Sequence, residues 1–110
     1  MRDAIASIRV RFVFPDGAER RVDIQVGAPF QNATKHWECE LDLQGIDGEL
    51  TAMISNDSFS ALAAALYLLR RRIELYRNTD IRVLYPHADE DLLLDCLFPP
   101  GLEDREAKNG

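Results

Sequence analysis

Cysteine and histidine are scarce in this chain of 110 residues, which contains two of each. Two cysteines cannot form the set of disulfides that staples many small secreted domains. Cys39 and Cys96 each lie in an apolar segment, where buried free thiols are expected. The histidines are far apart and do not combine with the cysteines into a pattern typical of zinc sites. We therefore expect no disulfide framework, no metal site and no cofactor.

The chain also lacks a long apolar run. Its longest mostly apolar segment, Phe59–Leu69, falls well short of the ~20 residues that a membrane-spanning helix needs. No basic segment precedes an apolar one at the N-terminus, so no secretory signal is recognised. These observations predict a cytoplasmic protein with no membrane contact.

Basic residues are absent from the middle of the chain. The whole sequence has 13 basic and 19 acidic residues and a net charge of −6. Between residues 36 and 69 there are acidic residues but no lysine or arginine. An acidic chain is a poor candidate for nucleic-acid binding, which depends on lysine and arginine at the phosphates. Its charge favours a basic protein partner instead.

Alternating apolar and polar residues predict four strands. The Pro15-Asp16-Gly17 turn makes a hairpin of the first two, and Gly45 with Asp47-Gly48 supplies a later turn. We expect Trp37 to point inward in the third strand and the apolar residues Leu50, Ala52 and Ile54 to point inward in the fourth. The expected strands lie near residues 8–14, 21–26, 37–44 and 50–54.

One long amphipathic helix is predicted over residues 58–77. Asn56-Asp57-Ser58 has the residue types that cap a helix N-terminus, and Asn78 suits its C-terminus. Arginines crowd the last turns, where positive charge suits the helix dipole. Apolar residues at helical spacing predict a buried stripe, made of Phe59, Leu62, Ala63, Leu66, Leu69, Ile73 and Tyr76.

The fold class that follows is α+β, with a four-stranded antiparallel meander packed on this one long C-terminal helix. Residues 81–85 read as a short extended segment. Leu92–Phe98 is apolar enough to dock on the core, although its pattern does not separate helix from strand. We predict a single domain over residues 1–99 and a flexible acidic tail over residues 100–110.

The strongest candidate site is an acidic row in the third strand. Glu38, Glu40 and Asp42 are spaced by two, which places their carboxylates on one face of a sheet. This acidic row could bind a basic partner. It could equally pair across the sheet with arginines of the neighbouring strands, namely Arg9, Arg11 and Arg21.

Two weaker candidates remain. His87, Asp89 and Asp91 have a spacing that could hold a metal or form a diffuse catalytic site, and they also read as an ordinary polar loop. The arginines of residues 70–72 spread around a helical turn and suit the helix dipole better than an anion site. No nucleophile elbow and no glycine-rich phosphate loop is present. We therefore expect a protein that is not an enzyme.

Several short motifs together resemble a family of small uncharacterised bacterial proteins that carries a domain-of-unknown-function label. They are Trp37-x-Cys39, Phe14-Pro15-Asp16-Gly17, Gly27-x-Pro29, Phe98-Pro99 and the helix start Asp57-Ser58-Phe59-x-Ala61-Leu62. The resemblance spans roughly residues 8–99 and implies a shared fold and a bacterial cytosolic setting, but no reaction. Ser60 stands where such a helix start is expected to have glutamine.

These observations favour a non-enzymatic protein-binding module whose acidic row covers a basic partner, as an immunity protein covers a toxin. A homodimer with an accessory or regulatory role, formed through an open sheet edge, is the alternative. An enzyme with a site near His87 is the third hypothesis.

Overall fold

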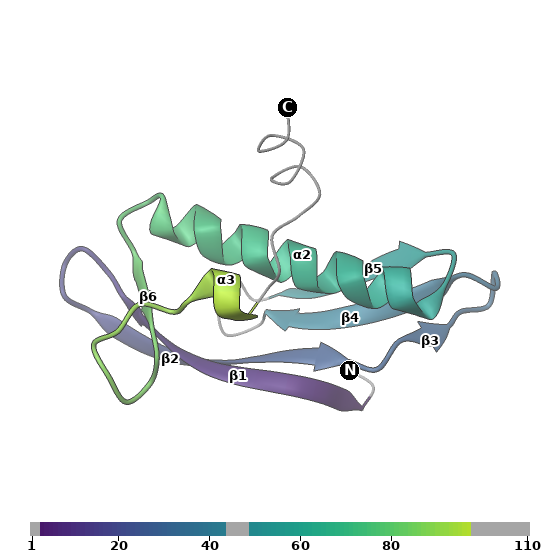
Figure 1. Cartoon of the computed structure of the whole chain (residues 1–110), viewed down its shortest axis with the longest axis horizontal. Coiled ribbons are helices and arrows are strands. Elements are labelled where there is room, and N and C mark those ends of the chain that lie inside the picture. Colours follow the sequence, from purple (N-terminus) through teal and green to yellow (C-terminus); the bar gives the residue numbers. More distant parts are fainter. Residues whose placement is uncertain (1–2, 44–48, 98–110) are drawn as a thin grey trace.

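An antiparallel sheet covered on one face by a long helix makes up the computed structural model, which describes residues 3–43 and 49–97 (Figure 1). The predicted α+β class is confirmed. Within these residues the helices are α2 (Ser58–Arg77) and the short α3 (Leu94–Leu97). The strands are β1 (Ala4–Val13), β2 (Glu19–Gly27), β3 (Phe30–Gln31), β4 (Trp37–Leu43), β5 (Glu49–Ser55) and β6 (Arg82–Leu84).

The described part of the chain forms a sheet of six strands, so the predicted number of four was too low. The four expected strands, β1, β2, β4 and β5, do pair in succession as a meander. The two additional strands are β3, which pairs with the start of β4, and β6, which pairs with β1. Strand β3 is too short to show an alternating pattern. Strand β6 lies within the extended segment expected at residues 81–85, but its pairing with β1 was not predicted.

Helix α2 has the predicted bounds, because both of its ends are capped. The Asp57 carboxylate accepts a hydrogen bond from the Ser60 N–H at 2.7 Å, and the Asn78 N–H donates to the Glu74 carbonyl at 3.0 Å. These contacts satisfy backbone groups that a helix end otherwise leaves unpaired.

The buried face of α2 is rotated from the predicted stripe. Its fully buried residues are Ala61, Ala65, Leu69 and Ile73, whereas Phe59 is 80% exposed and Ala63 is also exposed. The alanines let the helix approach the sheet closely, and larger side chains such as Leu66 and Leu68 pack on either side. The prediction that Phe59 and Ala63 are core residues was therefore wrong.

The inward and outward residues of β5 are also reversed from the prediction. Met53 lies opposite Cys39 of β4 and packs against the core, whereas Leu50, Ala52 and Ile54 are exposed. Because side chains alternate along a strand, the register with β4 decides which set is buried. The sequence pattern favoured the other face, because Leu50, Ala52 and Ile54 are more apolar than the set that contains Met53.

The segment after α2 closes the core at the other end of the sheet. Val83, Leu92 and Leu94 join the buried cluster, so the predicted docking of the segment from Leu92 onward is confirmed for its described part. The Arg77 guanidinium holds this segment by donating to the carbonyls of Val83 and Leu92.

Some predictions lie outside the described residues. They concern the turn at Gly45 and Asp47-Gly48 and the flexible acidic tail over residues 100–110. Within residues 3–43 and 49–97, no helix has the length and apolar character that a membrane crossing requires.

Candidate functional site

The acidic row lies on the face of the sheet opposite α2. Glu38, Glu40 and Asp42 are half-buried and alternate with Cys39 and Leu41, which are fully buried in the core. This alternation places the three carboxylates together on the outer face of β4, as the spacing predicted. Helix α2 packs only on the inner face, so this helix leaves the outer face of β4 and β5 uncovered (Figure 1).

An apolar row runs directly beside the acidic row. The register pairs Glu38 with Ile54, Glu40 with Ala52 and Asp42 with Leu50. Ile54 is 59% exposed and Leu50 is 42% exposed. We call these three β5 residues, Leu50, Ala52 and Ile54, the apolar row. Sequence reasoning missed this row, because it placed all three side chains in the core.

Two of the arginines that the alternative interpretation invoked, Arg9 and Arg11, form ion pairs with acids outside the acidic row. Arg9 pairs with Asp23 at 2.8 Å, and its hydrogen bond lowers the pKa of the Asp23 carboxyl. Arg11 pairs with Glu19 at 3.2 Å and with Asp89. Arg21 lies opposite Arg11 on the neighbouring strand. The ion-pair partners of Arg9 and Arg11 are thus acidic residues that do not belong to the acidic row.

On the side of β4 away from β5, two residues of the acidic row have an uncharged residue opposite them. Gln25 of β2 lies opposite Asp42, and Phe30 of β3 lies opposite Glu38. The acidic row is therefore flanked by the apolar row on one side and by an amide and an aromatic side chain on the other. Such a mixture of apolar and charged groups on an open face is typical of protein interfaces.

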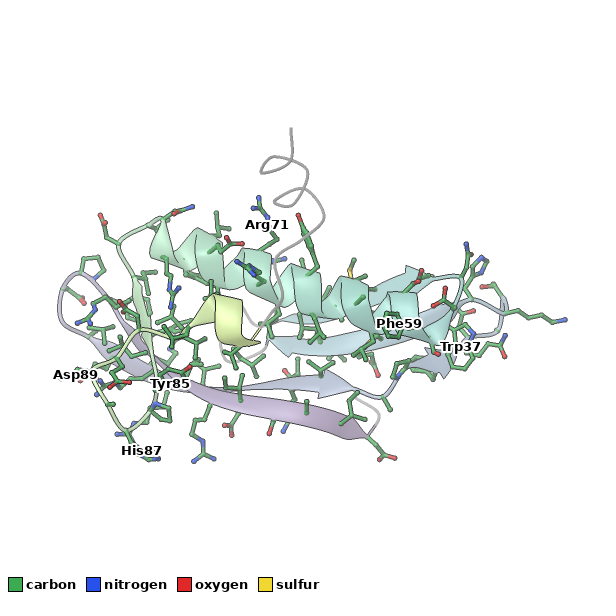
Figure 2. The ribbon with its side chains drawn as sticks, in the orientation of Figure 1. Trp37, Phe59, Arg71, Tyr85, His87 and Asp89 are labelled. Carbon is green, nitrogen blue, oxygen red and sulfur yellow. The ribbon has the colours of Figure 1, made fainter. Side chains whose placement is uncertain are left out.

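The polar loop after β6 does not bring its His and Asp side chains together as a group of metal ligands. His87 is exposed, Asp89 pairs with Arg11, and Asp91 lies 3.7 Å from Arg82 (Figure 2). Among the described residues, no three His, Cys, Asp or Glu side chains are grouped as metal ligands. The arginine contacts give both aspartates a structural part in holding the loop against the sheet.

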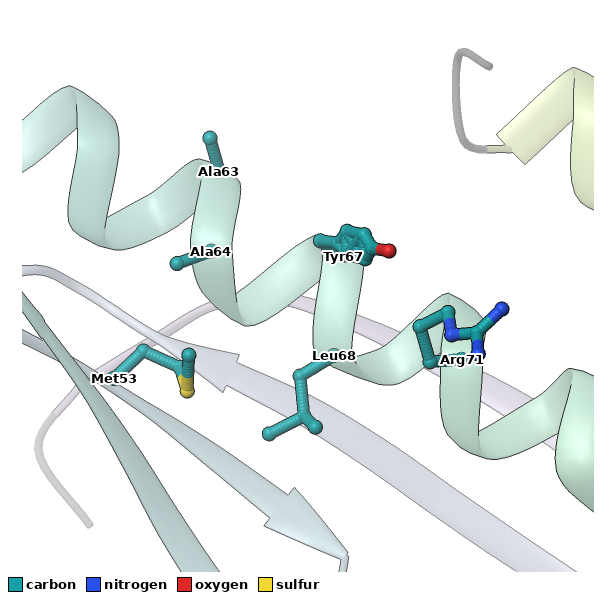
Figure 3. A pocket seen from close by; sticks show the side chains of 6 residues that line it. All are labelled: Met53, Ala63, Ala64, Tyr67, Leu68 and Arg71. Atoms are coloured by element: carbon teal, nitrogen blue, oxygen red, sulfur yellow. The ribbon is translucent and has the colours of Figure 1, made fainter. Parts of the chain in front are cut away.

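A hollow of about 520 Å³ opens between β5 and α2, away from the His87 loop (Figure 3). Its lining is almost entirely apolar, apart from the Arg71 guanidinium and the Tyr67 hydroxyl. Arg70 and Arg71 also lie 3.9 and 4.0 Å from Glu74, so both contribute to ion pairs within the helix. The lining residues are Met53, Ala63, Ala64, Tyr67, Leu68 and Arg71.

A family model described as "Domain of unknown function (DUF6968)" matches residues 8–93. The chain belongs to this family. The resemblance inferred from the short motifs is thereby confirmed, and the match extends from within β1 to the residue before α3. No curated protein and no solved structure matches the chain. The acidic row, the apolar row and the hollow all lie within the matched DUF6968 domain.

Cys39 is a core residue of the DUF6968 domain. Its side chain is fully buried, and its thiol donates to the Gly27 carbonyl at 3.3 Å. Burial raises the pKa of the thiol, and the neighbouring Glu40 carboxylate adds to the effect. Since the thiolate is the reactive form of cysteine, both effects suppress nucleophilic chemistry at this position. The prediction of a buried free thiol is confirmed for Cys39.

Proposed function

We propose that this protein is a non-enzymatic binding domain whose outer face at β4 and β5 covers a basic protein surface. The observation that carries the proposal is the adjacency of the acidic row and the apolar row on a sheet face that α2 leaves uncovered. The apolar row would be buried away from water in the complex and so contribute to affinity. The acidic row would favour a partner of opposite charge.

The charge of the whole molecule supports the same role. A net charge of −6 attracts a basic partner over a distance of about a Debye length and so speeds the encounter. A small acidic domain that masks a basic surface fits an immunity protein neutralising a toxin, and this is the partner class that we propose. Binding of this kind should weaken as the salt concentration rises.

The test is a pull-down from host lysate with the immobilised chain, followed by identification of the captured proteins. Glu38→Lys with Glu40→Lys should abolish capture of a basic protein, because the variant turns attraction into repulsion. Asp3→Lys with Glu90→Lys is a matched control. These two acids are exposed and belong to neither β4 nor β5, and the double substitution changes the net charge equally.

Melting curves of both variants would establish that they remain folded. Capture of the same basic protein by wild type and control, but not by the acidic-row variant, would support the proposal. Equal capture by all three chains, or capture of no basic protein by the wild type, would contradict it.

A further inference from the structure

The two outer edges of the sheet differ in how they are protected. At β6 the edge is covered by the chain itself, because the Leu92 N–H donates to the Val83 carbonyl at 2.9 Å and Asp91 forms a bridge with Leu84. The other edge belongs to β5, and within the described part of the chain β5 pairs only with β4. The backbone N–H and C=O groups on the outer side of β5 can therefore form hydrogen bonds with another strand.

The sequence of β5 lacks the features that usually protect an open edge. Edge strands are commonly blocked by lysine, proline or a bulge. From Leu50 to Ser55 the strand contains no charged residue and no proline, and it pairs with β4 in an unbroken register. This strand can accept a neighbour without burying a charge.

A second copy of the chain fits this edge particularly well. If two β5 strands pair antiparallel about a two-fold axis at Ala52, Leu50 of one copy faces Ile54 of the other. Thr51 then faces Met53, and no charged residue opposes another over this stretch. Apolar cross-strand pairs of this kind stabilise a sheet. The two apolar rows would form one continuous apolar band.

The position of α2 agrees with this arrangement. Its N-terminal half lies over β4 and β5, where Ala64 and Leu68 face Met53 across the hollow. A helix above the β4–β5 boundary lies about half a strand spacing from β5, and the two-fold axis would lie half a spacing beyond β5 on the other side. Each helix would thus be about one strand spacing from the axis, and the two helices would be about 10 Å apart. Packed helices have interaxial distances of ~8–10 Å.

Small side chains stand where the helices would meet. Helix α2 begins three residues after β5 and runs back along it. A strand rises about twice as far per residue as a helix, so the three residues from Ala52 to the end of β5 span about the same length as seven residues of α2. Ala52 therefore lies about level with Ala65, seven positions after Ser58. Ala63 and Ala64 are near this level and are partly or fully exposed, so they permit close approach of two helices.

Charge complementarity also favours a second copy. The two copies of α2 would run antiparallel and cross near Ala64. Arg71 of one copy is then about level with Asp57 of the other, because each residue is seven positions from Ala64. Arg71 is 66% exposed, and Asp57 is an exposed acid at the helix start. Hydrogen bonds from Ser60 lower the pKa of Asp57, so this carboxyl is negative at neutral pH. The 80%-exposed Phe59 stands at the same end of the helix (Figure 2).

We propose that the chain forms a two-fold symmetric homodimer through β5 and the adjoining face of α2. The sheets join into one, both helices lie on the same side of it, and the hollow beside Met53 is closed by the second α2. The acidic row stays on the outer face, so the dimer is independent of the proposed binding function.

Sedimentation of the full-length chain tests the dimer directly. We expect a dimer at micromolar concentration that Ala52→Glu weakens about tenfold or more, because two carboxylates would meet at the axis. Ala6→Glu is the matched control, since Ala6 is an exposed strand residue of β1 away from β5. A monomer at high micromolar concentration would overturn the proposal, as would a dimer that both substitutions affect equally.

A cross-linking experiment tests the position of the axis. Ala52→Cys should form a covalent dimer under mild oxidation, because paired Cα atoms of antiparallel strands are within disulfide reach. Ala6→Cys and the wild-type chain measure any background from the two native cysteines. Cross-linking of Ala52→Cys at the background level would overturn the proposed pairing, even if the variant folds normally.

Discussion

Two leucines on neighbouring strands provide a sharp test of the sheet register. Leu41 of β4 is fully buried, whereas Leu50 of β5 is 42% exposed on the opposite face. Leu41→Ala removes core methyl groups and leaves a cavity, which should reduce the free energy of unfolding by about 2–5 kcal/mol. Leu50→Ala removes partly hydrated atoms and should cost about 1 kcal/mol or less.

Urea unfolding followed by circular dichroism measures this difference. With a slope of about 2 kcal/mol per molar urea, the midpoint of Leu41→Ala should fall by roughly 1–2.5 M, and that of Leu50→Ala by roughly 0.5 M or less. Measurement at two protein concentrations separates these effects from association through β5. If Leu50→Ala destabilises the chain as much as Leu41→Ala at both concentrations, the register that exposes the apolar row is refuted.

Two further outcomes follow from titratable groups. Asp57→Ala should lower the melting temperature at neutral pH, whereas Asp3→Ala should not, because the Asp57 carboxylate caps α2. Hydrogen bonds from Ser60 lower the pKa of Asp57 in the folded state. The carboxylate therefore stabilises the fold above its unfolded pKa and loses this effect as the pH falls through its folded pKa. The gap between Asp57→Ala and wild type should thus narrow in acid; a gap that is independent of pH would contradict this. Burial and the nearby Glu40 raise the pKa of the Cys39 thiol, so iodoacetamide should label Cys39 only on unfolding. Peptide mass spectrometry with and without urea measures this, and rapid labelling of the native chain would argue against the buried position.

The helix was the most predictable element, for local reasons. Asp57 and Asn78 mark its ends through hydrogen bonds with residues three or four positions away. Such contacts depend only on nearby sequence, so the predicted bounds of 58–77 agree with the structure. The third predicted strand was recovered for a similar reason, because its alternation of apolar and acidic residues is unambiguous. The acidic row is therefore on one face, as its spacing indicated.

Other features depended on contacts between distant residues. Strand β6 exists because Val83 pairs with Phe12, seventy-one positions earlier in the chain. Phe59 is exposed because α2 packs with Ala61 and Ala65 toward the sheet, which turns Phe59 away from it. The pairing of β6 with β1 cannot be read from local periodicity. The rotation of α2 cannot either, since turning the helix by one residue leaves an equally apolar stripe.

By itself, the sequence determined the class of the fold, the ends of α2, the meander of four strands and the alignment of the acidic row. Each of these rests on spacing or capping within a short segment. The tertiary structure alone decided which face of β5 is buried, and hence that an apolar row lies beside the acidic row. It also showed that, among the described strands, β5 pairs only with β4 and lies next to an apolar hollow. The physical reason is that packing between distant segments determines the register of a strand and the rotation of a helix. The proposed binding face of β4 and β5 and the proposed dimer interface of β5 and α2 both depend on that register and that rotation.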